Sequence, residues 1–176
     1  MARGAIDATL AGGPEPRIPD IPFARQRRGA FVSLHEPGGD LRGCIGHVQG
    51  DRPLGEVIRQ VAVSAAQHDP RFAPVTREEL AEVRIEISVL SEPVNVAAAE
   101  LTRLVIGRDG VLVRNGRAQA VLLPQVAAEH GFGPEAFVDA ACHKAGLVPG
   151  SWREPTGATQ VFTFTADVFK EFQERA

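Results

Sequence analysis

The short segment Leu41–Gly46 places a cysteine and an arginine two residues apart and adds two glycines around the cysteine. A thiolate is a strong nucleophile, and a nearby cation favours this charged form of a thiol. In a strand Arg42 and Cys44 share one face, and Gly43 and Gly46 allow a ligand or another backbone to come close. We therefore predict Cys44 and Arg42 as candidate catalytic residues, with Gly43 and Gly46 in a binding surface. The alternative is a structural Cys44, a small buried residue in a tight bend.

A second candidate is Arg71, in the segment Asp69–Phe72. Its guanidinium has the fork geometry that binds a carboxylate or a phosphate with two hydrogen bonds. We predict that Arg71 is partly buried, bonded to an acidic or carbonyl oxygen, and close to the hexapeptide Leu41–Gly46. Its role is then either to bind a ligand or to form a structural bridge to an acid such as Asp69 or Glu86.

A cysteine nucleophile needs a base within hydrogen-bond reach, and the sequence does not identify one. His47 lies three residues from Cys44, on the opposite face of a regular strand, and the other histidines can approach only through the fold. Cys44 and His47 alone are a weak signal for a metal, while Cys142 and His143 diverge by roughly 100° on a helix. We accordingly predict no metal site and no cofactor.

The elements that position these residues begin with a hairpin, in which Gly29–His35 and Leu41–Val48 flank a glycine-rich turn. A helix follows from Leu54 to Ala65, with apolar residues at helical spacing, Asp51 as its predicted N-cap and Pro53 in its first turn. This apolar stripe should pack on the sheet that contains the returning strand. Thr76 and Glu79 have the spacing of a capping box.

The rest of the chain alternates short strands with helices that open on proline. Further strands are predicted at Arg84–Leu90, Leu104–Ile106, Val111–Val113, Ala118–Leu123 and Thr159–Ala166, and further helices at Ala2–Leu10, Pro124–Glu129 and Pro134–Ala145. This order predicts an α+β fold, a mainly antiparallel sheet with flanking helices in two lobes.

Composition limits the functions that fit the chain. The net charge of −3 over 176 residues gives no field that attracts nucleic acid, so no nucleic-acid partner is expected. No apolar run has the length of a membrane span, so no membrane partner is expected either. Two cysteines without CxxC spacing indicate free thiols, and the cytoplasm is the expected compartment.

Several separated segments together resemble the AMMECR domain family. The hexapeptide Leu41–Gly46 reads like its Leu-Arg-Gly-Cys-Ile-Gly signature, and matches continue at Asp69–Phe72, Arg84–Pro93, Leu123-Pro124 and Lys144–Leu147. The resemblance covers nearly the whole chain, which is expected to form one domain, residues 1–176, with a division between sub-lobes near residues 92–100. It implies a two-lobed α+β fold with the cysteine motif near the meeting of the lobes. The first helix of the family starts earlier, which implies that this chain begins inside it.

The resemblance also implies a function. In bacteria and archaea the family is similar to protein A of a three-part system, together with a Memo-type protein and a radical S-adenosylmethionine (radical SAM) enzyme. The chain is thus expected to be a component of a modification system that acts at a cleft around the hexapeptide Leu41–Gly46. The alternative is a non-catalytic binding or adaptor protein in which Cys44 is structural. His47 stands where small or hydroxyl residues are common in the family, so the resemblance assigns it no role.

Overall fold

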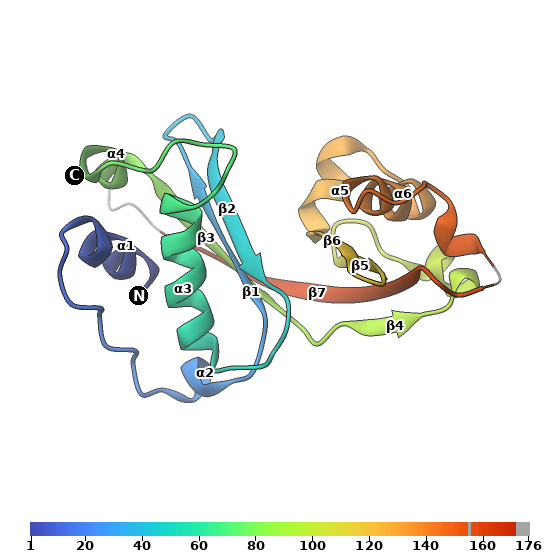
Figure 1. Ribbon diagram of the computed structural model, residues 1–176, viewed down its shortest axis with the longest axis horizontal. Coiled ribbons are helices and arrows are strands. Elements are labelled where there is room, and N and C mark those ends of the chain that lie inside the picture. Colours follow the sequence, from blue (N-terminus) through green and yellow to red (C-terminus); the bar gives the residue numbers. More distant parts are fainter. Residues whose placement is uncertain (155, 172–176) are drawn as a thin grey trace. The chain divides into compact units, whose positions relative to one another are not determined.

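The computed structural model describes residues 1–154 and 156–171 and divides into two compact units (Figure 1). Unit 1 comprises Met1–Leu90 together with Asp167–Ala176, and unit 2 comprises Ser91–Ala166. Residues 155 and 172–176, which the predicted single domain includes, lie outside the described residues. Each unit has its own hydrophobic core.

Antiparallel strands form the sheet of unit 1. Its order is β2 (Leu41–His47), β1 (Ala30–His35), β3 (Arg84–Leu90) and then the end of β7 (Gln160–Lys170). β1 pairs antiparallel with both neighbours, and β2 is the edge strand. The predicted hairpin and the predicted strand Arg84–Leu90 are therefore confirmed.

Helix α3 (Leu54–Gln67) covers one face of this sheet (Figure 1). Val57 and Val61 are buried in the core it shares with β1, as the apolar periodicity predicts. The predicted cap is wrong. Pro53 occupies the N-cap position without a side-chain hydrogen bond, while the carboxylate of Asp51 bonds Nε2 of His47 instead.

The remaining helices of unit 1 are short: α1 (Ala2–Leu10), α2 (Pro22–Arg25) and α4 (Arg77–Glu82). The capping box of α4 is confirmed, because the backbone N–H of Glu79 donates to the Thr76 hydroxyl and the N–H of Thr76 donates to the Glu79 carboxylate. Val75 and Leu80 are both buried beside it.

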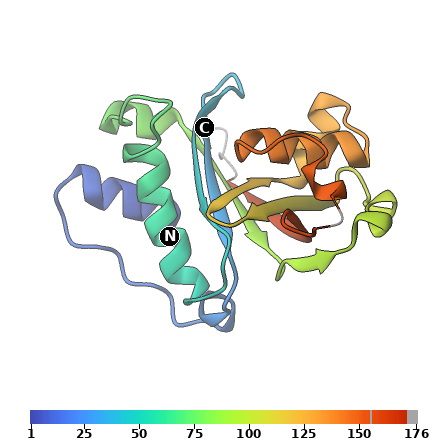
Figure 2. The same cartoon turned by 45° about the vertical axis from the view of Figure 1, so that its right-hand side comes forward.

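Unit 2 contains β4 (Val94–Val96), β5 (Asp109–Asn115), β6 (Ala118–Leu122) and the first part of β7, all paired antiparallel. Helices α5 (Pro124–His130) and α6 (Pro134–Lys144) lie together beside the β5–β6 hairpin (Figure 2). Two 3-10 turns, η1 (Ala98–Arg103) and η2 (Ser151–Arg153), complete the unit. In η2 the only tryptophan, Trp152, is buried and its indole N–H donates to Asp139 at 2.6 Å.

The predicted strand Leu104–Ile106 is wrong. The N–H groups of Arg108 and Asp109 both donate to the carbonyl of Val105, which closes a turn there. The buried carboxylate of Asp109 accepts the N–H of Val105 at 2.8 Å and fixes the same turn. The apolar side chain of Leu104 is still buried, so its hydrophobicity signals burial and not a strand.

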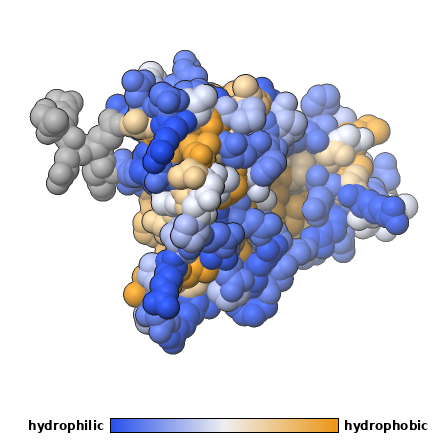
Figure 3. Space-filling model, turned by 60° about the vertical axis from the view of Figure 1, so that its left-hand side comes forward, coloured by the Kyte–Doolittle hydropathy of each residue, from blue (hydrophilic) through white to orange (hydrophobic). Residues whose placement is uncertain are grey.

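The fold class is confirmed as α+β, with a mainly antiparallel sheet and flanking helices. Hydrophilic side chains cover most of the face shown in Figure 3, with hydrophobic patches between them. Among the described residues no helix combines the length and the apolar character needed to cross a membrane.

Candidate functional site

Cys44 lies near the middle of the edge strand β2, directly opposite Ser33 of β1. The hydroxyl of Ser33 donates to Sγ of Cys44 at 3.2 Å. Ser33 is buried while Cys44 is half-buried, so the thiol has a fixed donor on one side and partial exposure. A hydroxyl in this position stabilises negative charge on the sulfur.

The backbone of Cys44 is also held by side chains. Its N–H donates to Oδ2 of Asp69 at 2.8 Å, and its carbonyl accepts from Nη2 of Arg71 at 3.2 Å. An edge strand leaves a row of such backbone groups without a neighbouring strand. Asp69 and Arg71 thus act at Cys44 as the missing strand would, and they fix the position of its Cα.

Asp69 and Arg71 form a two-bond ion pair. Nε of Arg71 donates to Oδ1 at 2.9 Å and Nη2 donates to Oδ2 at 2.7 Å, and the Arg71 N–H adds a third bond at 3.1 Å. The Asp69 side chain is 2% exposed and that of Arg71 is 53% exposed. The Arg71 guanidinium, helped by the N–H of Cys44, holds the pKa of the Asp69 carboxyl well below its usual range, against the opposing effect of burial. In return the bond to Asp69 raises the pKa of Arg71.

The predicted surroundings of Arg71 are therefore confirmed. It bonds an acid and a carbonyl oxygen, and the carbonyl belongs to the hexapeptide Leu41–Gly46. The structural bridge to Asp69 exists. Whether Arg71 also binds a ligand stays a prediction.

Arg42 is placed differently from its predicted position beside the thiol. Leu34 pairs with Gly43 and His35 with Leu41, which leaves Arg42 as the extra residue of a β-bulge. The bulge interrupts the alternation on which the shared face with Cys44 was predicted. The guanidinium of Arg42 consequently bonds a residue other than Cys44.

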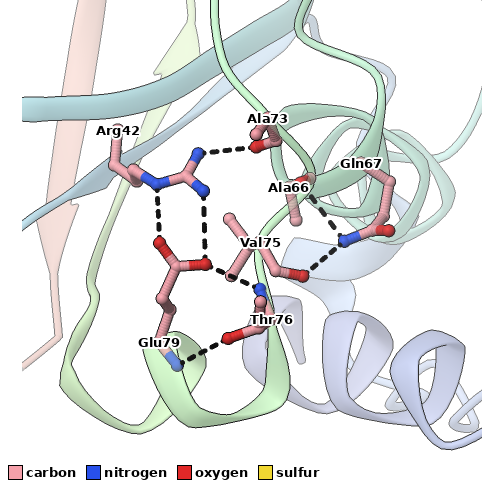
Figure 4. A network of polar contacts seen from close by, with 7 residues as sticks. All are labelled: Arg42, Ala66, Gln67, Ala73, Val75, Thr76 and Glu79. Atoms are coloured by element: carbon pink, nitrogen blue, oxygen red, sulfur yellow. Dashed lines mark hydrogen bonds and ion pairs between the residues drawn. The ribbon is translucent and has the colours of Figure 1, made fainter.

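That residue is Glu79 of α4, which Arg42 binds through Nε at 3.1 Å and Nη2 at 3.3 Å (Figure 4). Nη1 of Arg42 donates to the carbonyl of Ala73 at 2.9 Å. The N–H of Thr76 and then the Arg42 guanidinium hold the pKa of the Glu79 carboxyl below its ordinary value. Arg42 therefore joins β2 to the capping box of α4, and its charge is already neutralised.

The two glycines of the hexapeptide serve packing inside unit 1. A Cβ on Gly43 would lie 2.4 Å from the carbonyl oxygen of Ala65 in α3, and a Cβ on Gly46 would lie 2.2 Å from the ring of Phe31. Real Cβ atoms do not approach so closely, so glycine is required at both positions. Close approach of the α3 backbone explains Gly43 and close approach of the Phe31 ring explains Gly46, while a binding role for the two glycines stays a prediction.

His47, the histidine closest to Cys44 in sequence, bonds another residue. In residues 1–154 and 156–171 no hydrogen bond joins a histidine to Cys44, and Nε2 of His47 bonds Asp51 at 2.7 Å. The same described residues contain no group of three or more His, Cys, Asp or Glu side chains that could hold a metal ion. A pocket of about 220 Å³ lies between α1, β3 and the end of β7, with Met1, Ile87 and Phe169 in its wall, and Cys44 does not line it.

Two residues of this site are absent from the sequence-based candidates. The sequence predicts Asp69 only as a bridging partner for Arg71, and it indicates no role for Ser33. The register of the β1–β2 hairpin would identify Ser33 as the residue opposite Cys44, because the length of the turn sets which residues pair. No local pattern indicates that Asp69 reaches the N–H of Cys44.

Comparison with known proteins identifies the family of this chain. The AMMECR1 family model matches residues 1–169, and the chain belongs to that family, as the hexapeptide and the segment Asp69–Phe72 predict. It is 45% identical to a protein of Methanothermobacter thermautotrophicus over 177 residues, which cover 97% of this chain and 91% of that protein. A Thermococcus gammatolerans protein is 41% identical, with 97% and 87% covered.

The fold is also found in a solved structure. The crystal structure of an uncharacterized protein from Pyrococcus horikoshii is similar with a TM-score of 0.89 at 38% identity. The match covers 97% of this chain and 87% of that one.

Proposed function

We propose that this member of the AMMECR1 family is a thiol-dependent component of a modification system, in which Cys44 is the residue that reacts. Its proposed partners are a Memo-type protein and a radical SAM enzyme, as the family resemblance implies. The proposed compartment is the cytoplasm, where thiols remain reduced.

One observation carries this proposal: each polar group of Cys44 is held by a different side chain. Ser33 donates to the sulfur, Asp69 accepts the N–H, and Arg71 donates to the carbonyl. A small apolar residue in a bend needs no such frame, whereas a reacting group must be held in place by its neighbours. Arg71 takes the place predicted for Arg42 as the cation beside Cys44, because its guanidinium donates to the Cys44 carbonyl.

The second candidate is a non-catalytic adaptor, and the packing of the hexapeptide favours it. Gly43, Gly46 and Arg42 all serve contacts within unit 1. In that case Cys44 only fills space beside Ser33, and the partner binds the surface formed by the hexapeptide and Arg71. The two functions differ in what they require from the sulfur atom.

Replacing Cys44 with serine separates them. For a reacting thiol we expect Cys44→Ser to abolish complementation of a strain that lacks the gene, with a melting temperature within about 2 °C of the parent protein. Cys142→Ser is the matched control for loss of a thiol, since Cys142 is fully buried and burial raises the pKa of its thiol. A Cys44→Ser protein that complements fully would leave the adaptor as the function.

Thiol labelling supplies the second measurement. We expect iodoacetamide to modify Cys44 in the folded protein and Cys142 only after unfolding, with the two sites distinguished by peptide mass. If Cys44 is modified only after unfolding and Cys44→Ser clearly destabilises the protein, Cys44 is not a reactive thiol. Co-purification with the Memo-type and radical SAM proteins of the same genome tests the proposed partners.

A further inference from the structure

The outer edge of β2 is covered at Cys44 and unpaired at Gly46. The N–H of Cys44 donates to Asp69 and its carbonyl accepts from Arg71, so both groups point away from β1. Residues two apart on an antiparallel strand direct their backbone groups to the same side. The register with β1 is regular from Cys44 to Gly46, so the N–H and the carbonyl of Gly46 also point away from β1.

The backbone of Gly46 is available for a further hydrogen-bonded partner. Within residues 1–154 and 156–171, no side chain and no loop backbone bonds its N–H or its carbonyl. The ring of Phe31 fills the space where a side chain of residue 46 would lie, so the edge is the side from which Gly46 can be reached. Gly46 keeps part of its surface exposed. An unpaired N–H and C=O on an edge strand are a template for another extended chain.

We propose that the substrate of the reacting thiol is a polypeptide, one residue of which pairs antiparallel with Gly46 at the edge of β2. This inference rests on the proposed function, because it names the substrate class of the same thiol. In such a pair the substrate residue accepts the N–H of Gly46 with its carbonyl and donates its own N–H to the carbonyl of Gly46. Main-chain bonds of this kind are how an exposed sheet edge binds an extended peptide.

The antiparallel direction brings the next part of the peptide to the sulfur. β2 runs from Cys44 to Gly46, so the paired peptide runs from Gly46 towards Cys44. The two residues are about 6.8 Å apart along a strand. Asp69 and Arg71 occupy the edge at Cys44, so the peptide leaves the edge there. The group that follows the paired residue then lies at the level of the half-buried thiol.

A second copy of this chain fits the edge less well than a short peptide segment. Pairing of two β2 strands needs several consecutive residues with unpaired groups, since strands in sheets are typically about five to six residues long. The groups of Cys44 are already bonded, and the bulge at Arg42 interrupts the strand beyond it. One available residue cannot supply the roughly 1,200 Å² that a stable interface buries.

The test uses acetyl-Ala-Ala-Ala chloromethyl ketone, a peptide with an electrophile at its C-terminus, on the full-length protein. Its middle alanine can pair with Gly46 when the chloromethyl carbon lies at Cys44. Alkylation forms an S–C bond, breaks the C–Cl bond and releases chloride, and the solvent takes the thiol proton. Peptide mass spectrometry measures the rate at Cys44. Chloroacetone has the same reactive group without a peptide and is the reference, and each rate is divided by the rate of that reagent with free cysteine.

We expect the peptide reagent to modify Cys44 about tenfold faster than chloroacetone, with a rate that saturates, because two hydrogen bonds hold the peptide. Methylation of the middle alanine N–H should remove this advantage. Methylation of the first alanine N–H is the matched control, because that group points away from β2, and its rate should stay within about twofold of the unmethylated peptide. A peptide no faster than chloroacetone, or an equal loss for both methylated peptides, would overturn the proposal.

The protein concentration provides another outcome. A second copy bound to β2 would compete with the peptide, so a rate constant that falls as the protein concentration rises would overturn the proposal, whereas a constant value supports it. If chloroacetone labels Cys44 and complementation requires Cys44 but the peptide gains no advantage, only the polypeptide substrate is wrong. If neither reagent labels Cys44 in the folded protein, the proposed function fails as well.

Discussion

The backbone position of Cys44 depends in part on a buried carboxylate, that of Asp69. Asp69 accepts hydrogen bonds from the backbone of Cys44 and from Arg71, and its side chain is 2% exposed. It therefore connects the hexapeptide Leu41–Gly46 to the segment Asp69–Phe72. Loss of its charge would leave Arg71 without its ion pair.

We expect Asp69→Asn to lower the free energy of unfolding by about 2–3 kcal/mol at pH 7, the size of hydrogen bonds to a charged group. The pKa of Asp69 is depressed in the folded protein, so its contribution is complete above the unfolded value of about 3.9 and is lost as pH falls towards the folded value. The difference between the two proteins should thus stay constant from about pH 7 to about pH 5 and shrink below about pH 4. Urea unfolding across this range measures it.

Asp20→Asn is the matched control. Asp20 also pairs with an arginine, Arg25, but both side chains are largely exposed, and exposed pairs contribute little. We expect a change below about 0.5 kcal/mol for Asp20→Asn. An Asp69→Asn effect of the same small size would show that the pair does not hold Cys44.

Local patterns predicted some residues of the site well and others poorly. The capping box of Thr76 and Glu79 depends on residues three apart, so the sequence is sufficient to find it. The bulge at Arg42 depends on how β2 pairs with β1, which no spacing within β2 reveals. Arg71 was predicted with its correct kind of partner, whereas the link from Asp69 to Cys44 spans 25 residues of sequence.

At the scale of elements, the contact between β2 and α3 decides how closely the cysteine strand can lie to the core. Gly43 faces the carbonyl of Ala65 with no space for a side chain. The apolar stripe of α3 was predictable from its 3.6-residue period, and its packing on the sheet is confirmed. The short distance of 2.4 Å between a Cβ on Gly43 and the carbonyl oxygen of Ala65 exists only once the helix packs on the strand, so the sequence of either element alone does not reveal it.

We expect Gly43→Ala to destabilise the protein by about 2–3 kcal/mol, since the new methyl group meets backbone atoms that cannot rotate away. Gly38→Ala is the control: its Cβ would have no atom within 4 Å, and we expect a change within about 0.5 kcal/mol. Thermal unfolding compares the two. Equal melting temperatures of the Gly43→Ala and Gly38→Ala proteins would mean that α3 moves away from the new methyl group without a loss of stability.

At the scale of the whole molecule, unit 2 is one continuous segment of the chain. Unit 1 is built from two segments, one before unit 2 in the sequence and one after it. After Ala166 the chain adds several contacts to unit 1. They include the pairs Arg28–Asp167 at 2.9 Å, Lys170–Glu86 at 3.1 Å and Phe23–Phe169 at 5.6 Å between ring centroids. Unit 2 keeps all its paired strands when the chain ends at Ala166.

We therefore expect a protein that ends at Ala166 to lose hydrogen-exchange protection in β3 while β5 and β6 keep theirs. Deuterium uptake by peptide mass spectrometry measures both regions in one sample. The parent protein under the same conditions is the control. Equal loss of protection in β3 and β5 would show that the two units unfold as one.

The position of Trp152 has a practical consequence for the study of this protein. The only indole is buried in unit 2, while the half-buried thiol of Cys44 belongs to unit 1 and the other thiol is fully buried. A dye attached to Cys44 would therefore form a single energy-transfer pair with Trp152, with no residue replaced. Its fluorescence would follow the separation between the units in solution, with and without each proposed partner.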